Sequence, residues 1–76
     1  MRKTLAELGK KESGRILRVT CEGRIKRRLL DMGLVKGTLL EVQQIAPLGD
    51  PIEIKVKGYL LSLRKKEAGG IEVEIP

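Results

Sequence analysis

Residues 46–57 have the sequence APLGDPIEIKVK, which joins a dense turn signal to the most regular strand pattern in the chain. Proline and glycine punctuate its first half, as they do in tight turns. From residue 52 to residue 57 apolar and charged side chains alternate, which predicts a strand with one buried face. Residues 38–45 form a second strand, so the two segments predict an antiparallel hairpin.

Three further strands are expected, at residues 15–20, 59–63 and 71–75. In the first, Leu17 and Val19 can face inward, but Ile16 falls on the polar side, so this strand could instead be covered partly on both faces. Gly58 interrupts the run as at a bulge or a sharp bend. Five short strands with a glycine kink favour a mainly β fold, a small, partly open barrel, because a flat sheet would expose too many aliphatic side chains.

One short helix is expected from Arg24 to Met32. Ile25, Leu29 and Met32 are spaced at i, i+4 and i+7 and form one apolar stripe, while basic residues occupy the other faces. Gly33 follows this helix directly, at the position where a glycine in the left-handed conformation commonly caps a helix C-terminus. A single helical or 3₁₀ turn is also expected at residues 64–69.

The composition predicts one small domain spanning residues 1–76, since a chain of this length cannot divide its apolar core. Tyr59 is the only aromatic residue and Cys21 the only cysteine, which excludes an internal disulfide. No apolar run is long enough for a transmembrane helix, and the polar N-terminus does not resemble a signal peptide. We therefore expect a cytoplasmic protein that reaches a membrane only through a partner.

The net charge of +6 is concentrated in the first half of the chain. Residues 1–38 carry a net charge of +7 and residues 39–76 a net charge of −1. Such a basic half could meet nucleic acid, an anionic membrane surface or an acidic protein, or it could be a solvated surface without a partner.

No residue pattern indicates catalysis, a cofactor or a metal site. The chain has no histidine, and neither Ser13 nor Ser62 lies in a nucleophile motif. Cys21 is expected to be a small buried residue rather than a reactive thiol. Glu72 and Glu74 share a strand face, but a hard-cation site needs about six oxygen ligands. We therefore expect no enzyme activity, no cofactor and no metal ligands.

Nucleic-acid binding is an alternative interpretation of the basic helix, but the sequence lacks the features that usually support it. A nine-residue helix does not supply a helix–turn–helix framework, and Tyr59 alone provides little stacking surface for single strands. Phosphate contacts without stacking would be weak and sensitive to salt.

Two blocks of sequence, residues 27–38 (RRLLDMGLVKGT) and 46–52 (APLGDPI), together with Gly58-Tyr59, resemble the FeoA family. Residues 61–68 and 71–73 fit the same pattern, so the resemblance covers nearly the whole chain. It implies an SH3-like barrel and a small accessory or regulatory role beside FeoB, the membrane ferrous iron transporter with a cytosolic GTP-binding domain. The same fold occurs at the C-terminus of iron-dependent repressors, so a basic nucleic-acid-binding or repressor-associated module is the alternative.

The resemblance to the FeoA family predicts a surface that binds the cytosolic part of the transporter. The expected residues are apolar ones of the helix and the following turn, rimmed by arginines: Leu30, Met32, Leu34 and Val35, with Arg24, Arg27 and Arg28. Leu29 is assigned to the core, whereas Leu30 could serve either purpose. The same arginines could instead act on phosphate in trans, so assembly and regulation of GTP hydrolysis both stay open.

Two further points follow from the sequence. Lys36 stands where family members commonly have proline, which makes the Lys36-Gly37 turn less rigid. An open barrel edge could pair weakly with a second copy of the chain, although Lys and Glu on the outer faces would limit this pairing.

Overall fold

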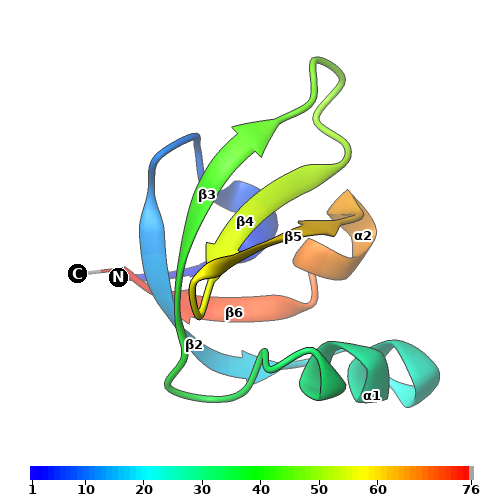
Figure 1. The fold of residues 1–76 in the computed structure, drawn as a ribbon. Coiled ribbons are helices and arrows are strands. Elements are labelled where there is room, and N and C mark those ends of the chain that lie inside the picture. The colour runs from blue at the N-terminus through cyan, green and yellow to red at the C-terminus, as the bar shows by residue number, and fades with distance from the viewer. Residues whose placement is uncertain (76) are drawn as a thin grey trace.

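The predicted hairpin is present inside the sheet of the computed structural model, which describes residues 1–75 (Figure 1). Strands β3 (Leu39–Ile45) and β4 (Ile52–Val56) pair antiparallel. The apolar face of β4 is buried, as its alternation predicted.

Four more strands extend this hairpin into an antiparallel sheet with the order β1-β6-β2-β3-β4-β5. They are β1 (Arg2–Thr4), β2 (Ser13–Val19), β5 (Tyr59–Leu63) and β6 (Ile71–Glu74). The sheet curls on itself without closing, and β1 and β5 form its two edges (Figure 1). The prediction of a mainly β, partly open barrel is therefore confirmed.

The predicted number of strands was one too low. The extra strand is β1, whose residues Arg2, Lys3 and Thr4 show no apolar alternation. β1 pairs only with β6 at the edge of the sheet. An edge strand can be held by backbone hydrogen bonds without a strongly apolar face, so the hydrophobic pattern gave no sign of it.

Gly58 lies in a tight turn and not in a bulge. Lys57 and Gly58 have φ values of +51° and +82° and connect Val56 directly to Tyr59. Two successive residues with positive φ are typical of a type I′ hairpin turn. β5 therefore folds back beside β4 instead of continuing it.

A bulge does occur in β2, where the register shifts between Ile16 and Arg18. Because a bulge changes the alternation of faces, Ile16 and Val19 are both buried while Leu17 is only partly buried. The inward position expected for Leu17 was therefore wrong, whereas the alternative of a strand covered partly on both faces agrees with the buried Ile16 and half-buried Leu17.

Helix α1 (Gly23–Asp31) begins and ends one residue before the predicted span Arg24–Met32. Gly33 has φ +91° and donates its N–H to the Leu30 carbonyl at 2.9 Å, while Leu34 N–H reaches the Leu29 carbonyl at 3.1 Å. These two bonds form a Schellman cap, with Leu29 and Leu34 both fully buried. The cap fixes α1 on the core at its C-terminal end.

Two short helical segments cover another side of the core, η1 (Leu5–Glu7) and α2 (Lys65–Ala68). The latter confirms the helical turn expected at residues 64–69. The buried core is aliphatic and comprises Leu5, Leu8, Ile16, Val19, Leu29, Leu34, Leu40, Val42, Ile52, Ile54, Val56, Leu63, Ala68, Ile71 and Val73.

Candidate functional site

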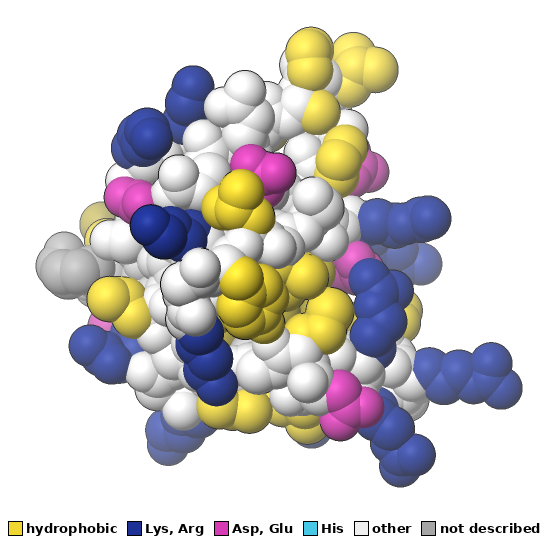
Figure 2. All heavy atoms as spheres, in the orientation of Figure 1, with side chains coloured by type: hydrophobic (Ala, Val, Ile, Leu, Met, Phe, Trp, Pro, Cys, Tyr) yellow, Lys and Arg dark blue, Asp and Glu magenta, His cyan; other side chains and the backbone are white. Residues whose placement is uncertain are grey.

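The solvent face of α1 carries a group of cations without acidic partners. Arg24, Lys26 and Arg27 are all exposed. Within residues 1–75 the ion pairs are Met1 N-terminus with Glu74, Arg18 with Glu72 and Arg28 with Glu67, and none of them involves these three side chains. Figure 2 shows Lys and Arg side chains projecting at the lower right, where Figure 1 places α1.

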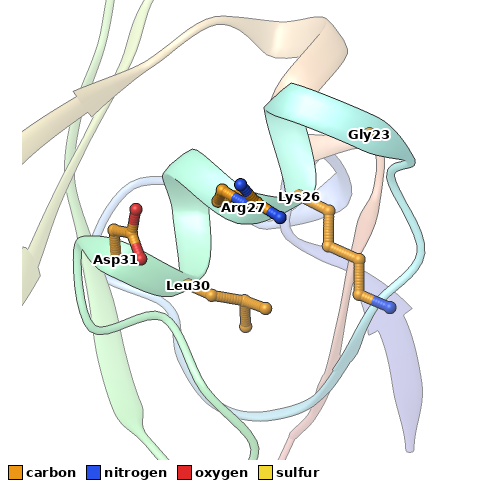
Figure 3. Close-up of a pocket in the computed structure, with 5 residues that line it drawn as sticks. All are labelled: Gly23, Lys26, Arg27, Leu30 and Asp31. Atoms are coloured by element: carbon orange, nitrogen blue, oxygen red, sulfur yellow. The ribbon is translucent and has the colours of Figure 1, made fainter.

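These cations border shallow hollows beside the helix (Figure 3). One hollow of about 400 Å³ is lined by Gly23, Lys26, Arg27, Leu30 and Asp31. Lys26 and Leu30 reach into the same open space, because positions i and i+4 lie on one helix face. A second hollow of about 300 Å³ lies against Gly23, Arg24 and Arg27. Leu30 is 38% exposed, so the first hollow presents an accessible apolar side chain beside two cations and the carboxylate of Asp31.

The charges near the N-terminus of α1 oppose the helix dipole. The first turn contains Arg24 and no acidic residue, and the N-cap residue Glu22 makes no side-chain cap. Asp31 stands at the other end, where a cation would be favourable. Each such misplacement costs about 0.3–1 kcal/mol near an exposed helix terminus. The arrangement therefore does not serve the stability of the helix.

Arg28 has a different role from its neighbours. Its guanidinium lies 3.0 Å from Oε2 of Glu67, and Nη2 donates to Oε1 at 3.5 Å. Glu67 is a buried charged residue, and its Oε1 also accepts the Arg64 N–H at 2.9 Å. Arg28 thus joins α1 to α2 and neutralises a buried carboxylate.

The apolar residues predicted for the partner surface also differ in their roles, since some belong to the core and others are exposed. Leu34 is fully buried, so its assignment to an exposed partner surface was wrong: the Schellman cap turns it into the core. Met32 is partly buried against the core, and its carbonyl accepts the Tyr59 hydroxyl. Val35 is 40% exposed in the turn after the helix and does not line either hollow.

Arg27 borders both hollows, so it connects Arg24 in one with Leu30 in the other, and the first hollow adds Lys26, which the predicted residue set omitted. The spacing of four residues between Lys26 and Leu30 was a signal that could have placed both on one face. We call this set, Arg24, Lys26, Arg27 and Leu30, the α1 surface.

The structure gives no geometry for metal chemistry within residues 1–75, where no group of three or more His, Cys, Asp or Glu side chains comes together. Cys21 is partly buried, and its thiol donates to the Glu67 carbonyl at 3.7 Å. A Cβ added at Gly70 would overlap Cys21 Sγ, so the thiol fills the space left by that glycine. Across the same residues, each helix is too short or too polar to cross a membrane.

A curled, open antiparallel sheet with a short helix packed at one end defines a small SH3-like β domain. Residues 3–75 match the family described as the FeoA domain. The chain belongs to the FeoA family.

Individual relatives agree with this assignment. The chain is 41% identical over 71 residues to a fusion protein of Porphyromonas gingivalis named Fe(2+) transport protein A/Fe(2+) transporter FeoB. That match covers 93% of this chain and only 8% of the fusion protein.

Two solved structures have the same fold. FeoA of Chlorobium tepidum is 45% identical with a TM-score of 0.89, over 96% of this chain and 70% of that one. FeoA of Stenotrophomonas maltophilia complexed with zinc, described as a prokaryotic SH3 domain protein, is 30% identical with a TM-score of 0.84, over 95% and 89% of the two chains.

Proposed function

We propose that this chain is a cytoplasmic accessory protein of a FeoB-type ferrous iron transporter and that it binds the transporter's cytosolic GTP-binding part through the α1 surface. It acts by binding and not by catalysis. Family membership and the Porphyromonas gingivalis fusion protein support the choice of partner, because fusion keeps two cooperating parts at a fixed ratio and in proximity.

The observation that carries the proposed surface is the unpaired charge on α1. Arg24 and Arg27 are three residues apart on the helix and repel each other, and Arg24 also opposes the helix dipole. No ion pair among the described residues compensates this repulsion, because none of them involves Arg24, Lys26 or Arg27. An acidic partner would neutralise the three cations and cover Leu30, so binding gives the arrangement a purpose that folding does not.

The partner patch should therefore be an apolar side chain surrounded by carboxylates. Opposite charges at the rim accelerate association and select the partner, while the covered apolar side chain slows dissociation. Action in trans on a phosphate would have to come from Arg24 or Arg27, because Arg28 is bound to Glu67.

The test compares Arg24→Glu and Leu30→Ser with Lys10→Glu, which makes the same change in net charge as Arg24→Glu at an exposed site outside α1. Affinity for the purified cytosolic part of the transporter is measured by calorimetry, and stability by thermal unfolding. We expect both α1 variants to bind at least about tenfold more weakly, as when one interface interaction is lost, and Lys10→Glu to bind nearly normally.

Arg24→Glu should also raise stability or leave it unchanged, because a carboxylate suits the first turn of a helix. Unchanged binding by both α1 variants would refute this surface. Binding of oligonucleotides at low salt that falls steeply toward physiological salt, with no binding of the transporter part, would favour the nucleic-acid alternative instead.

A further inference from the structure

The edge strand β5 lacks the usual protection of a sheet edge. Its five residues, Tyr59 to Leu63, include no charge and no proline. The opposite edge, β1, begins instead with Arg2 and Lys3. Natural edge strands commonly carry charges or proline, because an unprotected edge invites another strand to pair with it. β5 is therefore an available template.

The hairpin turn determines which backbone groups of β5 are free. A two-residue turn makes Val56 and Tyr59 a hydrogen-bonded pair. Because hydrogen-bonded and non-hydrogen-bonded pairs alternate in an antiparallel ladder, the backbone N–H and C=O groups of Leu61 and Leu63 also point toward β4. The N–H and C=O groups of Leu60 and Ser62 consequently point away from β4. Within residues 1–75, no other strand pairs along this side of β5.

Apolar side chains accompany this free edge on both faces of the strand. Leu60 is 58% exposed and Tyr59 is 41% exposed, while Leu61 is only partly buried against the core. In Figure 2 hydrophobic side chains gather at the centre of the view, where Figure 1 places β5 and its turn. An added strand would cover this apolar area as well as the two free peptide groups.

The charges at the two ends of β5 indicate what kind of strand fits. Lys57 lies in the turn before it, and Arg64, Lys65 and Lys66 follow it. In a symmetric antiparallel pair of two copies centred on Leu61, the turn that holds Lys57 of one copy would lie near the basic segment after β5 of the other, which holds Arg64 and Lys65. Like charges brought near each other at both ends of the pair repel, so charge complementarity argues against a second copy.

We propose that the free edge of β5 binds an extended segment of another protein, with apolar residues at its centre and acidic residues at its ends, which adds as a strand beside Leu60 and Ser62. Backbone hydrogen bonds would give affinity and the flanking cations would give specificity, as in other cases of strand addition. This site is separate from the α1 surface and does not depend on the proposed partner of α1.

The test uses a synthetic peptide of about nine residues, alternating valine and threonine with glutamates at both ends, and a matched peptide with lysines at both ends. Binding to isotope-labelled protein is followed by NMR through amide shifts and amide hydrogen exchange. Ser62→Pro removes one outward N–H and leaves the ladder with β4 intact, and Ser62→Ala is its control. Leu60→Glu adds a repulsive charge at an exposed position.

We expect the acidic peptide to slow exchange of the Leu60 and Ser62 amides. Ser62→Pro should weaken binding about tenfold relative to Ser62→Ala, as for loss of one backbone hydrogen bond, and Leu60→Glu should weaken it too. Three results would each overturn the proposal: no change at these amides with millimolar peptide, equal binding of the lysine-ended peptide, or self-association through β5 in the absence of peptide.

Discussion

Replacing Arg28 by alanine should destabilise the fold, although Arg28 lies on a helix whose other cations can be replaced at little cost. The side chain of Arg28 is 56% exposed, but that of Glu67, which it neutralises, is only 6% exposed. Hydrogen bonds to charged groups contribute about 1.5–3 kcal/mol each when buried. Because the arginine is exposed, solvent screens part of this interaction, so we expect Arg28→Ala to lower the free energy of unfolding by about 1–2 kcal/mol. For a domain of this size, that corresponds to a fall in Tm of about 5–15 °C.

Thermal and urea unfolding of Arg28→Ala, Glu67→Ala and the double variant measure this interaction as a cycle. The double variant should lose less than the sum of the single losses, because Arg28→Ala alone leaves the Glu67 carboxylate buried with only the Arg64 N–H. Arg27→Ala, an exposed cation one position earlier, is the control and should change stability by less than about 0.5 kcal/mol. Equal effects of Arg28→Ala and Arg27→Ala, with no coupling in the cycle, would refute the reasoning.

Three other predictions concern local structure. Lys36→Pro should raise the free energy of unfolding by about 0.4–1 kcal/mol in urea unfolding, because Lys36 occupies the second position of a turn closed by a 3.1 Å bond from Thr38 N–H to the Val35 carbonyl. Gly70→Ala should lower it by about 1–3 kcal/mol, since the new Cβ overlaps Cys21 Sγ, and adding Cys21→Ala should restore part of the loss. Glu7 accepts the backbone N–H of Thr4 at 2.7 Å, which lowers the pKa of its carboxyl from the ordinary value of a glutamate. The stability that the ionised Glu7 contributes is therefore complete above the pKa of Glu7 in the unfolded chain and is lost as the pH falls through its folded pKa. Glu7→Gln should reduce the loss of stability in an acid titration over that range.

The sequence predicted the parts of the fold that depend on alternation and on capping. The hairpin of β3 and β4, the cap at Gly33 and the helical turn near residue 65 each follow from a local pattern whose physical cause is also local. β1 and the bulge in β2 escaped prediction, because both depend on the partner strand β6 and leave no periodic pattern in their own residues. Gly58 indicated a break in the strand, but a single glycine does not distinguish a bulge from a two-residue turn.

The α1 surface was predictable only in part. Helical spacing correctly placed Leu29 in the core, but it left the position of Leu30 open and put Ile25 on the apolar stripe, although Ile25 is exposed. Leu34 lies beyond the helix, where that spacing no longer applies, and only the cap shows that it enters the core. The distinction between Arg27 and Arg28 depends on Glu67, which is 39 residues from Arg28 in sequence. No pattern within the helix contains this information.

This distinction changes how the α1 surface has to be tested. Reversing the charge of Arg27 and Arg28 together would remove a partner contact and a structural ion pair at once, and weaker binding could then reflect a destabilised α1–α2 contact. Single replacements separate the two effects: at Arg24 a carboxylate should weaken binding while stability rises or stays constant, whereas at Arg28 stability should fall. A residue retained for folding cannot give the first result, because loss of its side chain would have to lower the free energy of unfolding. Loss of affinity without loss of stability at Arg24 is therefore the result that would assign the charge of α1 to a partner.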